Sequence, residues 1–277
     1  SDLLDRFGNC FWLSKADLHK GYYQVPLSED CCHITAFTTP FGQFEWTRVP
    51  CGLKVCPSLF SNRMHKVIQG HESYFAAYID DFIIGSHTFE DHLQHVRNIL
   101  ECLDRYHLTL RLPKCEWFQP HVDFVGHEIG RGIMRPRESK VESLLQSKPP
   151  TSKRQLLSVL GLFNYYRNYI PNYAKIVLPL TNLTTKSMKF EWTVDCQNSF
   201  ETVKRFMTSH PILRIADFDK PFHLYIDAID HAAGACLMQT DEQGIDLPVM
   251  FYSKKFSATE SRYCTTEREA YALLLSC

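Results

Sequence analysis

The sequence lacks long apolar runs, a leader peptide, paired cysteines and repeats, and each absence excludes a class of protein. No run approaches the roughly 20 apolar residues that a membrane-spanning helix needs, and the N-terminus carries no charged and then apolar leader. The cysteines include no C-x-x-C pair and no regular spacing, and the chain holds no internal repeat and no low-complexity segment. The sequence therefore predicts neither a membrane protein nor a disulfide-based scaffold.

The cysteines and histidines that are present form no recognisable metal or disulfide pattern. The eleven cysteines are odd in number, which favours reduced thiols in an intracellular protein. His92 and His95 stand three apart in an expected helix, and we interpret them as part of a polar helix face rather than as zinc ligands. With 277 residues, of which 44% are hydrophobic, the chain has material for about two domains with real cores.

Charge is unevenly distributed along the chain, although the net charge is only −1. Residues 1–147 carry a net −3, residues 148–214 a net +7 and residues 215–277 a net −5. A basic middle between acidic ends suits a polyanion held between acid-rich sites. A solvated, lysine-rich helical segment would give the same distribution, so charge alone leaves both interpretations open.

Turn and capping signals predict the elements of the first half. The segment "TTPFGQFEW" indicates a hairpin around Pro40 and Gly42. Residues 88–107 indicate a helix that begins with a capping box of Thr88 and Asp91. Its apolar positions at helical spacing are Phe89, Leu93, Val96, Leu100 and Leu103. Strand-like segments follow at "LTLRL" and "VDFVGHEI".

The second half begins with a hinge at "SKPPTSK", residues 147–153. Ser152 and Gln155 form a second capping box and open a helix that Pro171 ends. The apolar face of that helix and the segment after it holds Leu156, Leu160, Phe163, Tyr166 and Ile170. A further helix is expected over 194–208, with Phe200, Val203 and Met207 on one face. Residues 222–238 read as strands with Gly234 in a turn, and the final "TTEREAYALLLSC" reads as a helix that stops without a cap, as in a fragment.

The most unusual feature is the pair Asp80 and Asp81 inside the apolar run "YFAAYIDDFIIGS". Neighbouring residues of a strand point to opposite faces, so one carboxylate would be driven into the core at a cost of several kcal/mol. A hairpin tip between "FAAYI" and "FIIGS" avoids this cost. A solvated turn explains the pair equally well on these residues alone.

A third acidic residue, Asp17, could join Asp80 and Asp81 in a metal site. Asp17 in "SKADLHKGYYQVPL" follows the apolar Phe11, Trp12 and Leu13 and precedes a glycine and two tyrosines. Together, Asp17, Asp80 and Asp81 could bind two Mg²⁺ ions, which prefer carboxylate oxygens and the phosphates of a substrate. Two such ions about 4 Å apart stabilise the attacking and leaving oxygens of phosphoryl transfer.

These motifs occur in the order of a known family. The segments are "SKADLHKGYYQVPL", "TTPFGQFEWTRVPCGL", "YIDDFIIGS", "HLTLRLPKCEWF", "FVGHEIG" and "LLSVLGLFNYYRNYIPNY". In this order they resemble the reverse transcriptase of gypsy-like LTR-retrotransposon polyproteins. The following "FEWTVDCQNSFETVK" and "PFHLYIDAIDHAAGACLMQ" resemble the tether and the start of the ribonuclease H domain.

The resemblance implies an α+β fold in three parts. Residues 1–147 would be a reverse-transcriptase palm with an antiparallel sheet and helices, with its fingers largely missing. Residues 148–215 would be a helical thumb and connection, and residues 216–277 a C-terminally truncated ribonuclease H-like α/β domain. The implied activity is RNA-directed DNA polymerization with an associated ribonuclease H, although we expect the isolated fragment to be inactive.

The resemblance also assigns roles around the polymerase site. Asp17 and Asp80 as main ligands, with Asp81 as a secondary one, would hold two Mg²⁺ ions, with Mn²⁺ as an alternative. One ion would activate the primer 3′-hydroxyl and the other would hold the triphosphate. Tyr22 would exclude a 2′-hydroxyl by bulk; taken alone it reads as a core aromatic residue. The nucleotide site would be completed by Pro50, Gly52 and Lys114, although a solvated lysine is an equal interpretation of Lys114.

The resemblance also implies residues that contact the template–primer duplex. The primer-grip hairpin would consist of Phe124, Val125, Gly126 and His127. Lys153, Arg154 and Arg167 of the basic segment would contact the phosphate backbone and set affinity rather than sequence preference.

In the ribonuclease H part, Asp227 and Glu269 match two of the usual four catalytic acids. The chain departs from the family at Cys51, where Phe is usual, at Val55-Cys56, where Asn-Ala is usual, and at Ile229, where Ser is usual. The departures support an alternative, a decayed or domesticated element that binds nucleic acid without catalysis. An unrelated hydrolase with a carboxylate pair would leave the other motifs to chance.

The implied partners are an RNA or DNA template–primer duplex, deoxynucleoside triphosphates and other polyprotein segments such as protease and integrase. No membrane partner is implied. The expected location is intracellular and cytoplasmic, with a virus-like particle or the nucleus as alternatives.

Overall fold

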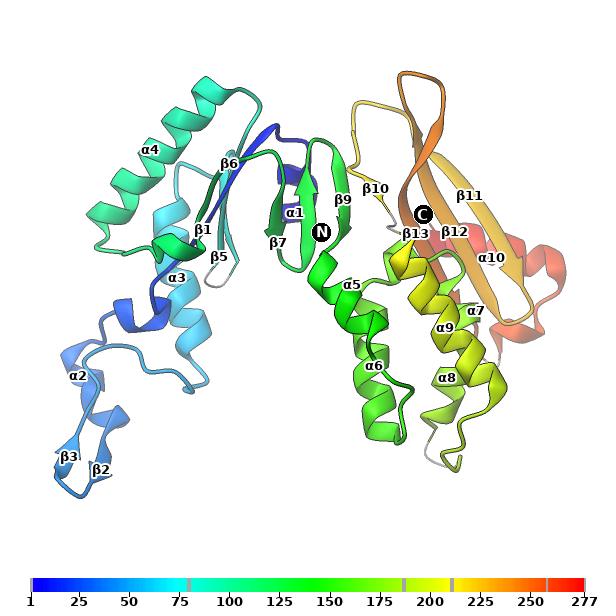
Figure 1. Ribbon diagram of the computed structural model, residues 1–277, viewed down its shortest axis with the longest axis horizontal. Helices are drawn as coiled ribbons and strands as arrows, with labels where there is room; N and C mark the ends of the chain where they lie inside the picture. Colours follow the sequence, from blue (N-terminus) through cyan, green and yellow to red (C-terminus); the bar gives the residue numbers. More distant parts are fainter. Residues whose placement is uncertain (1, 79–80, 186–187, 210–211, 258, 277) are drawn as a thin grey trace. The chain divides into compact units, whose positions relative to one another are not determined.

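The computed structural model describes residues 2–78, 81–185, 188–209, 212–257 and 259–276 (Figure 1). The chain divides into two compact units. The first comprises Ser1–Val125 with Ile129–Arg131, and the second comprises Gly126–Glu128 with Gly132–Cys277. The division thus falls in the hairpin that the sequence assigns to the primer grip.

The first unit alternates short strands with helices. Its helices are α1 (Asp2–Gly8), α2 (Glu29–Cys32), α3 (Cys56–Ile68) and α4 (Phe89–Arg105), with 3₁₀ turns η1 (Gly21–Gln24), η2 (His33–Thr35) and η3 (Leu112–Lys114). Its strands are β1 (Trp12–Asp17), β2 (Phe37–Thr39), β3 (Gly42–Phe44), β4 (Phe75–Tyr78), β5 (Asp81–Ser86), β6 (Glu116–Gln119) and β7 (Val122–Phe124). The predicted hairpin around Pro40 is confirmed, because β2 and β3 pair antiparallel.

A four-stranded sheet of order β4-β5-β1-β6 forms the centre of the first unit. Strands β4 and β5 pair antiparallel up to Tyr78 and Asp81, and β1 pairs antiparallel with β5 from Trp12–Ser86 to Asp17–Asp81. Helices α3 and α4 pack against this sheet, as Figure 1 shows. The core between them contains Phe60, Phe75 and Phe82, all almost fully buried, so the acidic ends of β1 and β5 are held on a packed scaffold.

Helix α4 confirms its predicted capping box, but of its five predicted apolar positions only Val96 and Leu103 are buried. The Thr88 side chain accepts a hydrogen bond from the Asp91 amide. Phe89, Leu93 and Leu100 are more than 40% exposed. The buried face instead contains His92, Val96, Ile99, Cys102 and Leu103. The apolar residues alone misplace the buried face of α4, because the polar His92 lies in that face.

The second unit combines a helical bundle with a three-stranded sheet. Its helices are α5 (Glu138–Leu145), α6 (Lys153–Tyr165), α7 (Tyr173–Ile176), α8 (Leu178–Leu183), α9 (Val194–Thr208) and α10 (Thr265–Ser276), with 3₁₀ turns η4 (Arg167–Tyr169) and η5 (Glu260–Arg262). Its strands are β9 (Ile133–Pro136), β10 (Leu213–Arg214), β11 (His223–Ile229), β12 (Ala232–Thr240) and β13 (Asp246–Lys255), and β8 (His127–Gly130) lies across the division.

The predicted helices of the second unit are present, but the one that begins after Ser152 ends at Tyr165 and is followed by η4, so its predicted end at Pro171 is wrong. The Ser152 side chain caps α6 at the Gln155 amide, as the capping box predicts. The residues predicted to face the core, from Leu156 to Ile170, are buried in one cluster together with Phe200 and Met207 of α9. This cluster is the hydrophobic core of the bundle.

The strands near the C-terminus form an antiparallel sheet of order β11-β12-β13, and α10 packs on β11 and β12. The prediction that Gly234 lies in a turn is wrong, because Gly234 pairs with Asp227 inside β12. Its missing side chain makes room for Asn172, whose Oδ1 lies 2.2 Å from the position that a Cβ would take. The glycine signal therefore reflected close packing rather than a turn.

Two further expectations were tested by the structure. The segment "LTLRL" forms only an isolated bridge between Leu18 and Leu110 before the 3₁₀ turn η3, so the predicted strand is wrong there. Every cysteine in the described part of the chain is free. No helix among the described residues is long and apolar enough to cross a bilayer.

Candidate polymerase and nuclease sites

The end of the β1–β5 pair brings two of the predicted acids together. Asp17 is the last residue of β1 and Asp81 the first of β5, and the two are directly opposite each other in the antiparallel register. Opposed residues point to the same face of a sheet, with Cβ atoms about 5 Å apart. Asp80, the other member of the doublet, lies outside the described residues.

Two lysines neutralise this pair of carboxylates. The Lys15 Nζ lies 3.5 Å from Asp81 Oδ1, and the Lys114 Nζ lies 3.6 Å from Asp17 Oδ2. Lys15 precedes Asp17 by two positions in β1, so strand alternation places both on one face. The signal for Lys15 in the sequence is its spacing of two positions from Asp17 in "SKAD".

The donor set fits a divalent ion. Carboxylate oxygens on neighbouring strands are the ligands that Mg²⁺ prefers, and the scaffold beneath them is rigid. The described residues contain no group of three or more histidine, cysteine or acidic side chains that could hold a metal. The third acid of the predicted set is Asp80, so the described residues contribute two carboxylates.

A buried hydrogen-bond chain links the same two strands behind the acids. His92 of α4 is fully buried, and its Nε2 and Nδ1 lie 2.8 Å from the hydroxyls of Ser14 in β1 and Ser86 in β5. The Ser86 hydroxyl also lies 2.8 Å from Nδ1 of His95. The sequence interpretation of both histidines as a polar surface face is therefore wrong for His92.

One orientation of the hydrogens satisfies this chain from end to end. The Phe118 amide donates to Ser14 Oγ, which leaves the Ser14 hydroxyl hydrogen for His92 Nε2. His92 Nδ1–H then donates to Ser86 Oγ, and the Ser86 hydroxyl donates to His95. Such a chain requires neutral imidazole, and burial lowers the pKa of His92 to about 4.

The predicted nucleotide-binding residues lie on three segments of the first unit: Tyr22 in η1, Pro50 and Gly52 in the loop before α3, and Lys114 in η3. Tyr22 lies in η1, half-buried, with its ring 5.2 Å from that of Phe60. Pro50 is buried, and its carbonyl accepts a hydrogen bond from the Cys56 thiol. Gly52 has a φ of +99°, which a side chain would strain. Tyr22 therefore contributes to the core whether or not it also contacts a nucleotide sugar.

The predicted primer-grip residues form a tight hairpin between β7 and β8. Phe124 is fully buried, while Val125 and Gly126 form the turn with positive φ values of 46° and 75°. His127 is buried, and burial lowers its pKa to about 4. The side chain of His127 therefore faces protein rather than solvent.

The three predicted phosphate contacts differ in their surroundings. Arg154 and Arg167 are exposed. The Lys153 ammonium donates to the carbonyls of Thr185 and Met188, at 2.6 and 2.5 Å. The structure thus gives Lys153 an intramolecular role, which sequence alone did not indicate.

In the second unit, Asp227 of β11 and Glu269 of α10 line one cavity of about 460 Å³. Thr266, Ala270 and Leu273 of α10 complete its wall. Ile229, the departure from the family pattern, is the last residue of β11. The structure brings the two predicted nuclease acids to a common opening.

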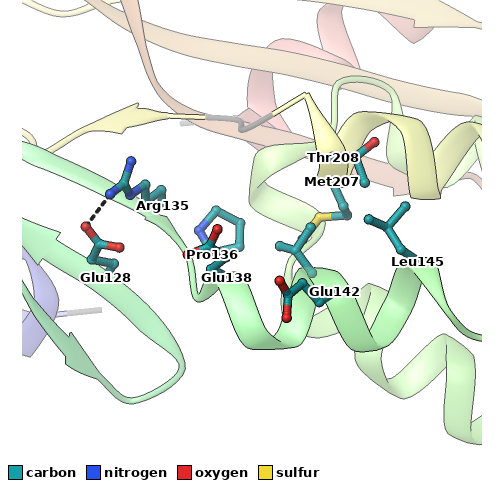
Figure 2. Close-up of a pocket in the computed structure, with 9 residues that line it drawn as sticks. Glu128, Arg135, Pro136, Glu138, Glu142, Leu145, Met207 and Thr208 are labelled. Carbon is teal, nitrogen blue, oxygen red and sulfur yellow. Dashed lines mark hydrogen bonds and ion pairs between the residues drawn. The ribbon is translucent and has the colours of Figure 1, made fainter.

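A separate cavity of about 390 Å³ lies between the β8–β9 hairpin, α5 and α9 (Figure 2). Its floor contains Pro136, Leu145 and Met207, and Glu128 and Arg135 form an ion pair at one end, marked by the dashed line. The site residues predicted from sequence are not among those that line this cavity.

Two family models match the chain. The model described as "Reverse transcriptase (RNA-dependent DNA polymerase)" matches residues 2–129, and the "RNase H-like domain found in reverse transcriptase" matches residues 192–277. The two family matches define a chain of the reverse-transcriptase class.

Curated relatives give the source of such chains. The Pol polyprotein of transposon opus from Drosophila melanogaster is 34% identical over 99% of this chain and 28% of its own length. The Tf2-3 polyprotein of Schizosaccharomyces pombe is 32% identical over 95% of the chain and 20% of its own length. The chain belongs to the reverse transcriptase–ribonuclease H region of retrotransposon polyproteins, and it spans less than a third of these relatives.

Solved structures support the fold. A foamy viral protease–reverse transcriptase in complex with double-stranded DNA matches with a TM-score of 0.88 and 24% identity, over 98% of this chain and 48% of that chain. The same viral protein with an RNA/DNA hybrid matches with a TM-score of 0.82 and 23% identity, over 98% and 37%. The α+β fold expected from the sequence is confirmed.

Proposed function

We propose that this chain carries the catalytic centre of an RNA-directed DNA polymerase that uses two divalent metal ions. The supporting observation is the register of β1 and β5, which sets Asp17 and Asp81 side by side at the ends of the two central strands of the sheet. Asp80, beside Asp81 in the sequence, supplies the third carboxylate of the proposed site. Residues 1–147 act as palm, 148–215 as thumb and connection, and 216–277 as ribonuclease H-like domain.

The acids would hold the metal, and the lysines would balance charge before it binds. Mg²⁺ held by Asp17, Asp80 and Asp81 would supply Lewis-acid chemistry, lowering the pKa of the primer 3′-hydroxyl and stabilising charge on the triphosphate. Lys15 and Lys114 reduce the repulsion between Asp17 and Asp81 in the metal-free protein. The Lys114 side chain is half exposed, which leaves it free to turn toward a triphosphate when an ion takes its place beside Asp17.

Nucleotide selection would rest on Tyr22 and the loop of Pro50 and Gly52. Packing on Phe60 limits the movement of the Tyr22 ring, so bulk at that position can exclude a ribose 2′-hydroxyl. The positive φ at Gly52 lets the backbone turn sharply and leaves no side chain in the way of a nucleotide. The substrates are therefore deoxynucleoside triphosphates on an RNA or DNA template–primer duplex.

The ribonuclease H assignment rests on Asp227 and Glu269. Both acids line the same cavity, and this geometry supports a metal-assisted hydrolysis site with further ligands. Protease and integrase segments, which accompany such regions in the polyproteins of the family, are the proposed neighbours. The proposed location is the cytoplasm, in virus-like particles or the nucleus during replication.

Primer extension on an RNA template with Mg²⁺ tests the polymerase proposal. The longest protein that the reading frame encodes should extend the primer, and Asp17→Asn or Asp80→Asn should reduce the rate by roughly 100-fold or more, since even outer-shell ligand partners contribute 10–100-fold. Asp104→Asn, the same substitution on the exposed side of α4, is the matched control. Equal extension by Asp17→Asn and the control protein would refute the site.

A second function is favoured by the departures at Cys51, Val55 and Ile229. A decayed or domesticated element would bind template–primer duplexes without extending the primer. The same assay separates the two functions: duplex binding that is unaffected by Asp17→Asn, together with no extension by the unmodified protein, supports the binding module.

A further inference from the structure

The turn of the β7–β8 hairpin has a conformation that its own sequence does not favour. Two-residue turns with positive φ at both positions suit Asn-Gly, whereas this turn contains Val125 and Gly126. A β-branched residue in the left-handed region is strained, since its Cβ crowds the backbone. The surrounding structure must therefore hold the turn.

Hydrogen bonds within the second unit, to which Gly126 and His127 belong, hold the turn. The Tyr166 hydroxyl donates to the Gly126 carbonyl at 2.9 Å, and the Arg137 amide donates to the same carbonyl at 3.2 Å. The Tyr169 hydroxyl forms a 2.8 Å hydrogen bond with His127 Nδ1. Both tyrosines are about 2% exposed, so these bonds are shielded from water.

Aromatic packing fixes the same residues. The His127 ring is stacked with Tyr165 and Tyr169, at centroid distances of 5.3 and 5.7 Å, and Tyr166 meets it edge-on at 5.5 Å. A Cβ at Gly126 would come within 3.0 Å of the Tyr165 hydroxyl. The turn therefore fits closely against the end of α6 and against η4.

We propose that Tyr166 and Tyr169 are positioning residues for the primer strand, because they fix the turn at Gly126 and His127. This inference rests on the proposed polymerase function. The same segment carries Arg154 and Arg167, the proposed phosphate contacts. The two tyrosines thus bond to the hairpin, which would hold the primer 3′ end. Their own segment carries the arginines that would contact the phosphate backbone of the primer. In this proposal His127 holds the hairpin through its bond with Tyr169 and does not contact the primer itself.

Removal of single hydroxyl groups tests the inference. Tyr166→Phe and Tyr169→Phe keep the rings and lose one hydrogen bond each. Tyr173→Phe is the matched control, because the buried Tyr173 hydroxyl donates to Asn164 at 2.8 Å in the same core but does not touch the hairpin. Hydrogen exchange should show about tenfold faster exchange of amides 126–128 in the first two variants and wild-type exchange there in the control.

Binding of a duplex with a recessed primer 3′ end is measured on the same proteins. Tyr166→Phe and Tyr169→Phe should weaken this binding about tenfold, with less effect on a blunt duplex, while Tyr173→Phe binds as the unmodified protein does. Thermal denaturation shows whether each variant is folded. If Tyr166→Phe does not fold, Tyr169→Phe alone tests the inference.

The outcomes distinguish the two proposals. Unchanged exchange at the hairpin in both variants overturns the inference. Faster exchange with unchanged preference for the recessed end also overturns it, because the two hydrogen bonds would then be structural only. Failure of the unmodified protein to bind any template–primer duplex overturns the proposed function, whereas the exchange result still decides whether the tyrosines hold the turn.

Discussion

At the scale of single residues, neutral histidines hold together two buried parts of this protein. His92 bridges Ser14 and Ser86 on the strands that carry the acids, and His127 joins the hairpin to Tyr169. Burial lowers the pKa of both imidazoles to about 4. Each can accept a hydrogen bond only while it is neutral, so both sites depend on the absence of a proton.

This pKa predicts acid sensitivity of the first unit. The folded protein keeps His92 neutral down to about pH 4, whereas the unfolded chain takes up a proton near its usual 6.5. The unfolded state therefore binds more protons in between, and stability falls as the pH drops from 6.5 to 4. For His92 this loss is on the order of 3 kcal/mol. Urea unfolding followed across that pH range measures it.

A variant without an ionisable side chain at position 92 tests whether His92 causes the loss of stability in acid. His92→Gln should lower stability at pH 7 but make its decline with acid shallower, while His87→Gln, at an exposed position after β5, should keep the wild-type slope. A His92→Gln slope as steep as that of the unmodified protein would show that another group titrates. His127 contributes the same sign from the second unit, so some slope is expected to remain.

Residue roles were only partly predictable from the sequence. The adjacency of Asp17 and Asp81 followed from the motifs, because an acid at a strand end and a doublet at a hairpin tip can meet. The bridge through His92 did not, because the binding partners Ser14 and Ser86 lie 78 and 6 positions away. Long-range hydrogen bonds leave no periodic signal in a single sequence.

At the scale of elements, α6 presents one face to its core and another to solvent. Leu156, Leu160 and Phe163 are buried, whereas Leu157 and Tyr165 are about half exposed. Gly161 is exposed in the same helix, and no atom lies within 4 Å of the position that a Cβ would take. A glycine inside a helix costs stability relative to alanine, and the space next to Gly161 is open in this structure.

Two substitutions at Gly161 separate stability from binding. Gly161→Ala should stabilise the helix by about 0.5–1 kcal/mol, because alanine loses less backbone entropy on folding. Gly161→Leu should fold as well but weaken binding of a template–primer duplex, because its side chain would hold the duplex away from Arg154. Thermal denaturation and fluorescence anisotropy measure the two effects, and wild-type affinity of Gly161→Leu would place the duplex elsewhere.

Helix boundaries were predicted better than buried faces and turns. The capping side chains of Thr88 and Ser152 act on local backbone amides, so the sequence within four positions contains the whole signal. The exposed side of α4 and the position of Gly234 depend on what the rest of the fold brings against them. Asn172, which fills the space above Gly234, is more than 60 positions away.

At the scale of the whole molecule, charge separates into a basic segment and two acidic ones. Residues 148–214 carry a net +7, while the chain as a whole carries −1. Binding to a polyanion should therefore come from this segment and weaken steeply with salt, because each neutralised phosphate releases a counterion.

Salt dependence distinguishes the three proposed phosphate contacts. Arg154→Ala and Arg167→Ala should each reduce the slope of log affinity against log salt by about 0.9. Lys153→Ala should leave the slope nearly unchanged and lower thermal stability, because the Lys153 ammonium already bonds Thr185 and Met188. A slope change for Lys153→Ala equal to those for the arginines would mean that its internal bonds open when the duplex binds.

The central claim is that the carboxylates at the ends of β1 and β5 form a divalent-metal site. Titration with Mn²⁺, followed by electron paramagnetic resonance of the free ion, measures it without requiring activity. The protein should bind Mn²⁺ in competition with Mg²⁺, and Asp17→Asn and Asp81→Asn should each weaken that binding at least tenfold, while Asp104→Asn should not. Wild-type Mn²⁺ binding by Asp17→Asn and Asp81→Asn would contradict the account.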